Sequence, residues 1–241
     1  MRARMKLLQD QLASSPLSAR FLPFFIFVAL TALQGRLGEG SEYWVYAGKT
    51  LVGAWLVWLM RPYVPEMRWA FSWEAVAVGV GVGVIWVGLD PYYPRMGDLL
   101  ARLGLSAPPD PAAAPAPWNP LARYGEGSLL GWLFVVTRLA GSTLVVPPLE
   151  ETFYRSFLYR YLIKADFTAV ALNTWATTPF VVTAVVFGLV HYEWLAGILC
   201  GAAYLGLVIH QGRLGDAITA HAITNFLLGL WVVWRGAWHF W

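Results

Sequence analysis

Apolar runs of the length needed to cross a membrane recur along the chain and constrain its fold more than any other feature. A transmembrane helix needs about 20 predominantly apolar residues. Seven segments approach that length: residues 21–35, 43–60, 71–89, 128–148, 177–191, 193–210 and 216–235. The 241 residues are 58% hydrophobic and only 13% charged, which is too apolar for an ordinary soluble domain. We therefore expect an all-α, polytopic membrane protein of about seven transmembrane helices.

Aromatic and basic residues indicate how these helices lie in a bilayer. Many Trp and Tyr residues stand near the ends of the apolar runs, as Trp44, Tyr192 and Trp234 do, which is typical of interfacial aromatic belts. With the N-terminus inside, ten Lys and Arg residues fall on the cytoplasmic side and six on the other. This bias favours a cytoplasmic N-terminus and explains the net charge of +3 without a nucleic-acid partner. The Ala-, Arg- and Trp-rich composition is typical of a bacterial protein, so we expect the bacterial inner membrane.

The chain divides into two parts by the chemistry that it carries. Residues 1–127 hold the first three apolar runs and a Pro/Ala-rich stretch, 108–120, which we expect to be an irregular surface loop. Residues 128–241 hold the unusual polar groups and would form a catalytic membrane core. Within that core, Gly197 and Gly201 have the GxxxG spacing that favours close helix packing.

Three short polar motifs interrupt the apolar segments of the second part. They read "EETFYR" at 150–155, "FGLVH" at 187–191 and "HAITN" at 221–225. An ionisable residue in the middle of a membrane helix costs about 2.5 to 3.5 kcal/mol on insertion scales. Such a cluster therefore calls for a functional explanation.

The first motif separates its two acids by helical geometry. Glu151 and Arg155 are four residues apart, so they share a helix face and are expected to form an ion pair. Glu150 is rotated by about 100° from Glu151 and is expected to remain a free carboxylate. Pro147 and Pro148 are expected to end the preceding helix and to begin a new one, which would place Glu150 near a helix N-terminus.

The other two motifs supply groups that could act with Glu150. His221 and Asn225 also share a helix face, and at 1.5 Å per residue His191 and His221 can reach a common site in the cytoplasmic half of the bilayer. A buried Glu with a neighbouring His can deprotonate a water molecule. A His/Asn pair opposite them can stabilise the oxyanion that forms when this water attacks an amide carbonyl. The combination predicts peptide-bond hydrolysis in a pocket inside the helix bundle.

Other interpretations of these residues remain open. A single His in an apolar helix is usually a packing residue, and His210 and His239 fit that description. The polar set could also hold a peptide without cutting it, in a non-catalytic membrane peptide-binding or immunity-type protein. A small transporter fits less well, because the polar groups cluster at one depth instead of forming a path across the bilayer.

The three motifs together resemble the signature of the type II CAAX prenyl endopeptidases, also called the CAAX protease and bacteriocin-processing family of intramembrane proteases. That signature is EExxxR, FxxxH and HxxxN or HxxxD, and the likeness covers roughly residues 128–235. The resemblance implies a glutamate protease in which Glu150 and His191 activate water, His221 and Asn225 bind the oxyanion, and Glu151 and Arg155 support the site. Residues 73–94 also resemble a bacterial subgroup that is associated with exosortase systems.

The resemblance also bears on cofactors and substrates. Two Glu and two His could in principle bind zinc, but the chain has no HExxH pair on one helix, so we expect no metal and no other cofactor. Bacterial members need no prenylated substrate. The implied partners are therefore the lipid bilayer and a membrane-bound, lipidated or C-terminal peptide.

Overall fold

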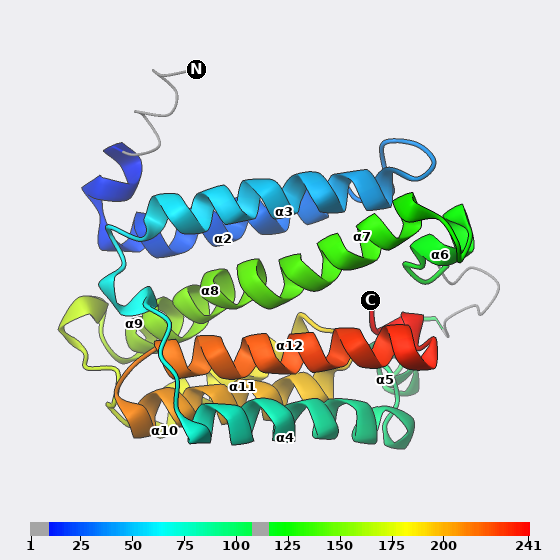
Figure 1. The fold of residues 1–241 in the computed structure, drawn as a ribbon. Helices are drawn as coiled ribbons and strands as arrows, with labels where there is room; N and C mark the ends of the chain where they lie inside the picture. The colour runs from blue at the N-terminus through cyan, green and yellow to red at the C-terminus, as the bar shows by residue number, and fades with distance from the viewer. Residues whose placement is uncertain (1–9, 108–115) are drawn as a thin grey trace.

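The computed structural model describes residues 10–107 and 116–241, and these form helices and connections without any strand. Helical stretches run side by side and alternate in direction (Figure 1). They are α2 (Pro16–Thr31), α3 (Ser41–Met60), α4 (Trp73–Leu89), a long helix Leu129–Ile163 made of α7 to α9, α10 (Thr177–Leu189), α11 (Trp194–Gln211) and α12 (Gly215–Arg235). Every predicted apolar run coincides with one of these helices.

The membrane character of the fold rests on helix length and apolarity. Among the described residues, four helices are long and apolar enough to cross a membrane: α4 with the turn that follows it, the long helix, α11 and α12. α2 and α10 are apolar but shorter. The chain is therefore an all-α integral membrane protein, as predicted.

The connection between α4 and the long helix has more structure than expected. It contains the 3-10 turn Asp90–Tyr92 and two short helices, α5 (Met96–Arg102) and α6 (Pro120–Tyr124). Of the predicted irregular loop 108–120, residues 108–115 lie outside the described part. Trp118 lies inside it and is buried against Tyr43 and Tyr46, so the end of the loop is docked on α3.

The predicted break at Pro147 and Pro148 is wrong, because the helix continues from Leu129 to Ile163. Two π-helical turns, Gly141–Val145 and Thr152–Leu158, flank the α-helical segment α8 (Val146–Glu151). A proline inside an α-helix lacks an N–H and clashes with the carbonyl four residues earlier. The wider turn before Pro147 provides the space that lets the helix continue. Glu150 therefore lies within a helix, and the expected helix-dipole effect at an N-terminus does not apply to it.

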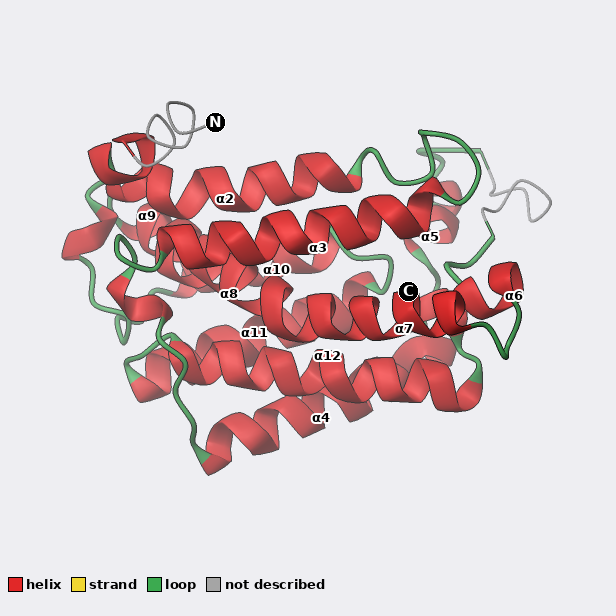
Figure 2. Ribbon diagram, turned by 45° about the horizontal axis from the view of Figure 1, so that its top comes forward, coloured by secondary structure: helices red, strands yellow, loops and turns green. Residues whose placement is uncertain are grey.

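The helices form layers around the long helix. α2 and α3 lie on one side of it, and α4, α11 and α12 lie on the other (Figure 2), with α10 packed against α11. Glycines allow the closest approaches: a Cβ on Gly79 of α4 would lie 2.6 Å from the backbone oxygen of Ala220 in α12. One on Gly201 of α11 would lie 3.0 Å from the backbone oxygen of Ala184 in α10, which confirms the close packing predicted at this GxxxG spacing.

The main core draws on residues from both sides of position 127. Phe24 of α2 stacks on Phe153 of the long helix with ring centroids 4.3 Å apart, and Val82 of α4 joins the same cluster as Ile218 of α12. The division of the chain into 1–127 and 128–241 stays a prediction about function.

A carboxylate at the end of the bundle where α3 ends is held by two arginines. Oε1 of Glu66, in the turn Pro65–Met67, accepts hydrogen bonds from Nη2 of Arg20 at 2.6 Å and Nη2 of Arg160 at 2.9 Å, and from the Ser156 hydroxyl. Burial raises the pKa of Glu66, but the charge of Arg20 and the hydrogen bonds lower it by more, so the pKa lies below its ordinary value. Arg155 and Arg160 are both buried within the long helix.

Candidate functional site

The predicted ion pair between Glu151 and Arg155 is present and completely buried. Nη1 of Arg155 donates to Oε1 of Glu151 at 3.1 Å, and both side chains have 0% exposure. Nη2 of Arg155 donates to the backbone oxygen of Gly201, and the guanidinium lies 4.3 Å from the centroid of the Phe187 ring. The pair therefore ties the long helix to α10 and α11.

His221 of α12 binds the same carboxylate oxygen. Its Nδ1 lies 2.8 Å from Oε1 of Glu151. Since Glu151 is paired with Arg155 and acts as a carboxylate acceptor, Nδ1 of His221 carries the proton, and Nε2 is the nitrogen left for another partner. The ring stacks on Tyr204 with centroids 5.1 Å apart.

Glu150 has a different environment from its neighbour. No described residue forms a hydrogen bond or an ion pair with it, and its Oε2 is buried without a partner. Its charge is within electrostatic reach of Lys49 and His191. The two adjacent acids therefore differ: Oε1 of Glu151 is bound by Arg155 and His221, whereas neither oxygen of Glu150 has a partner among the described residues. Oε2 of Glu151 is also buried without a partner.

His191 lies just beyond the end of α10 and is fixed by that helix. Its Nδ1 lies 2.7 Å from the backbone oxygen of Phe187. Because a carbonyl can only accept, Nδ1 carries the proton and a neutral His191 presents the lone pair of Nε2. The ring packs against Phe187 and Trp86, with centroids 4.8 and 5.6 Å away.

Phe187 brings the two histidines to one place. Its ring centroid lies 4.8 Å from that of His191 and 6.2 Å from that of His221. The convergence expected from helix arithmetic is therefore present, with an aromatic ring between the two imidazoles. Phe187 is 1% exposed and also covers Arg155, so the FxxxH motif supplies the centre of the packing as well as a histidine.

Asn225 has a hydrogen-bond partner that was not predicted. Its Nδ2 donates to the backbone oxygen of Ser142 at 2.8 Å. In the π-helical turn the N–H of Val146 bonds to Gly141, so the carbonyl of Ser142 would next require a donor from residue 147, which is a proline without an N–H. Asn225 supplies the missing donor and keeps a second amide proton for other contacts.

Lys49 is the charged residue near the site that the sequence analysis did not single out. It lies on α3 and is 7% exposed; its Nζ donates to Oγ1 of Thr31 at 2.9 Å and lies 4.9 Å from the Phe27 ring centroid. The sequence did contain a signal for this residue, because a lysine within the apolar run 43–60 is unusual. Lys49 was used only in the count of basic residues on the two sides of the membrane.

Two Glu and two His are a donor set that could suit zinc. Among residues 10–107 and 116–241 there is no group of three or more His, Cys, Asp or Glu side chains arranged to hold a metal ion. The carboxylate of Glu151 and Nδ1 of His221 bind each other, and Nδ1 of His191 binds a carbonyl.

The fold and this cluster together define an integral membrane protein that holds carboxylate, imidazole and amide groups inside a helix bundle. Residues 131–227 match the family model described as type II CAAX prenyl endopeptidase Rce1-like. That segment contains all six predicted site residues and is similar to this family, which supports a membrane protease at the family level. No curated protein and no solved structure matches the chain.

Proposed function

We propose that the protein is an intramembrane glutamate endopeptidase that hydrolyses a peptide bond in a membrane-associated or C-terminal peptide. Glu150 and His191 would activate the attacking water, and His221 and Asn225 would bind the oxyanion. Glu151 and Arg155 would hold the site in place. No cofactor takes part in this chemistry.

The contrast between Glu150 and Glu151 is the observation that carries the proposal. A catalytic base needs a carboxylate oxygen that can accept a proton from water. Glu151 is tied to Arg155 and His221 through its Oε1, although its Oε2 is free, whereas Glu150 has no hydrogen bond or ion pair with any described residue and its Oε2 is buried. An unpaired carboxylate in a membrane interior is costly, and a role in binding water explains why it is kept.

His191 has the tautomer that suits a partner of this base. With its Nδ1 proton donated to Phe187, the Nε2 lone pair can accept a hydrogen bond from the same water. Glu150 takes one proton as the water oxygen bonds to the amide carbon. The protonated Glu150 then gives this proton to the leaving amine as the C–N bond breaks, so the carboxylate is restored.

The oxyanion would be held by groups on α12. Asn225 offers the amide proton that Ser142 does not use. His221 can donate from Nε2 only when both ring nitrogens are protonated, and the Glu151 carboxylate beside Nδ1 stabilises the positive charge of that form. Glu151 would thus be a positioning residue that acts through His221.

We further propose that the protein lies in a bacterial inner membrane with its N-terminus in the cytoplasm. The excess of basic residues on the N-terminal side supports this orientation. His221 is seven positions into α12, which begins at Gly215 at the end of the bundle where α2 also begins (Figure 1). The site would then be reached from the cytoplasmic half of the bilayer.

The proposal is tested with purified protein reconstituted in lipid nanodiscs and a library of membrane-anchored peptides, with cut sites read by mass spectrometry. We expect cleavage at defined positions by the wild type and none by Glu150→Gln. Peptide binding that survives Glu150→Gln, with no cleavage by either protein, would instead identify a non-catalytic peptide-binding protein.

A further inference from the structure

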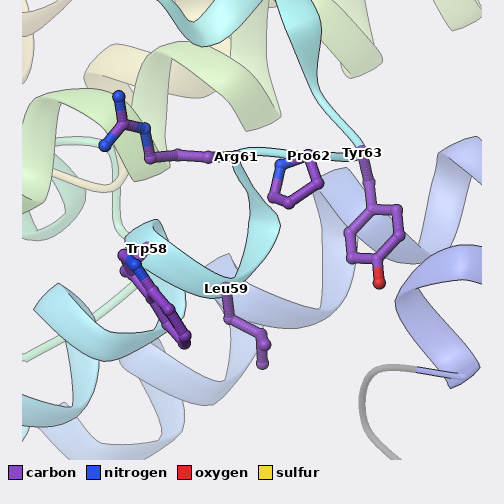
Figure 3. Close-up of a pocket in the computed structure, with 5 residues that line it drawn as sticks. All are labelled: Trp58, Leu59, Arg61, Pro62 and Tyr63. Carbon is purple, nitrogen blue, oxygen red and sulfur yellow. The ribbon is translucent and has the colours of Figure 1, made fainter.

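Two adjoining hollows lie at the turn between α3 and the Pro65–Met67 segment. The first has a volume of about 270 Å³ and is lined by Trp58, Leu59, Arg61, Pro62 and Tyr63 (Figure 3). The second, of about 200 Å³, is lined by Arg61, Pro62, Val64, Met67 and Arg68. Arg61 and Pro62 line both hollows, and we refer to the two together as the recess.

The recess carries two positive charges without counter-ions. Neither Arg61 nor Arg68 forms a hydrogen bond or an ion pair through its guanidinium with any described residue. The carboxylate between them in sequence, Glu66, is already bound by Arg20 and Arg160 on its inner side. The two exposed guanidiniums are therefore available to an anion from outside the protein.

The surroundings place the recess at the boundary between lipid and water. Trp58, Trp69 and Trp73 at this end are 63%, 49% and 77% exposed, and exposed tryptophans gather at the headgroup level of a bilayer. Trp58 and Leu59 belong to the last turn of α3, and Arg61 follows directly after that helix with its side chain pointing away from both (Figure 3). The recess therefore combines apolar side chains at the end of α3 with the charge of Arg61.

From this arrangement we infer that the recess binds the headgroup of an anionic phospholipid. The phosphodiester would lie between Arg61 and Arg68 in the second hollow, since guanidinium groups form paired hydrogen bonds to phosphate oxygens. The glycerol backbone and upper acyl chain would cover Trp58 and Leu59 in the first. This site is independent of the proposed protease activity and explains why both arginines lack protein partners.

Headgroup charge decides which lipids fit. In phosphatidylcholine the choline cation neutralises the phosphate, whereas phosphatidylglycerol keeps its negative charge. Each arginine near an anionic lipid contributes a factor of about five in affinity. We therefore expect the pair to favour phosphatidylglycerol over phosphatidylcholine by about 20- to 30-fold.

Native mass spectrometry of the delipidated full-length protein, titrated with each lipid, tests the site. The wild type should hold one phosphatidylglycerol with this preference, Arg61→Gln and Arg68→Gln should each lose about fivefold, and the double variant should lose the preference. The matched control is Arg36→Gln with Arg102→Gln, which removes two exposed arginines at the opposite end and should retain it.

Three outcomes would overturn the inference. The wild type could bind the two lipids equally, or Arg61→Gln and Arg68→Gln could keep the whole preference for phosphatidylglycerol. The Arg36/Arg102 control could also lose as much of this preference as the Arg61/Arg68 double variant. A third arm adds inorganic phosphate at millimolar concentration. If inorganic phosphate displaces the lipid and binds the protein as tightly as the lipid does, the recess is a phosphate site and not a lipid site.

Discussion

Glu151 and His221 are 70 positions apart in sequence, yet Oε1 of the first lies 2.8 Å from Nδ1 of the second in the interior of the bundle. This contact joins the long helix to α12 and fixes which imidazole nitrogen stays free. It also engages Glu151, whereas the adjacent Glu150 has no partner and can bind water. Glu151 therefore has a structural role in the site, and Glu150 is the acid left for catalysis.

Glu151→Gln should destabilise the protein strongly. The substitution leaves Arg155 as a buried charge without a partner, and breaking a buried ion pair in this way costs about 3 to 5 kcal/mol. We expect a large fall in the thermal unfolding midpoint in detergent. Glu150→Gln is the matched control, because Glu150 has no pair to lose and should keep a midpoint close to that of the wild type. Similar midpoints for both variants would contradict the structural role of Glu151.

His191→Ala should lower turnover by more than tenfold while the protein stays folded. General acid–base groups typically raise the rate by factors of about 10² to 10⁴. The Nε2 lone pair of His191 is free to accept a hydrogen bond from water, because Nδ1 donates to Phe187. His210→Ala is the comparison, since His210 is exposed at the end of α11. Cleavage of one membrane-anchored peptide by each variant gives the rates. An unchanged rate in His191→Ala would remove this residue from the mechanism.

Gly79→Ala should impair both stability and activity. The added Cβ would lie 2.6 Å from the backbone oxygen of Ala220, one residue before His221, so α4 and α12 must move apart. Overpacking of this kind costs about 1 to 3 kcal/mol. Gly81→Ala, two residues further along α4, meets no atom within 4 Å and should be harmless. Equal midpoints and equal cleavage rates for the two variants would show that this contact does not position α12.

The charge cluster around Glu66 should make stability depend on pH in the acid range. The folded pKa of Glu66 is lower than its ordinary value, so the unfolded chain binds its proton first. The ionised Glu66 therefore stabilises the folded protein above pH 4.5, the ordinary pKa of this carboxyl. This contribution is lost as the pH falls through the lower pKa of the folded state. Glu66→Gln should abolish this dependence and cost about 2 kcal/mol at neutral pH, since Arg20 and Arg160 lose a charged acceptor.

Unfolding midpoints measured between pH 3 and pH 7 check this prediction. Glu39→Gln serves as the control because Glu39 pairs with Arg123 on the surface, where it is 87% exposed. A pH profile of Glu66→Gln that matches the wild type would contradict the assignment.

The sequence predicted the helices and the Glu151–Arg155 pair because both depend on local spacing. Apolar length identifies a membrane helix, and a separation of four residues places two side chains on one face. It also anticipated that His191 and His221 converge, because their depths along two helices could be compared.

The features that were missed depend on tertiary contacts. The helix passes through Pro147 because a π-helical turn precedes it and because Asn225, 83 positions away from Ser142, supplies a hydrogen-bond donor that the proline lacks. The approach of Lys49 to Glu150 requires the packing of α3 on α8, which no local pattern contains. The hydrogen bonds of Glu66 to Arg20 and Arg160 likewise depend on tertiary packing, because the two arginines lie on other helices.

The central claim is that Glu150 is the base, and its most direct test compares Glu150→Gln with the wild type on one cleaved peptide. Gln keeps the shape of the side chain but cannot accept the proton of water, so we expect turnover to fall by at least 10²-fold with an unchanged unfolding midpoint. Retained cleavage by a folded Glu150→Gln protein would contradict the account.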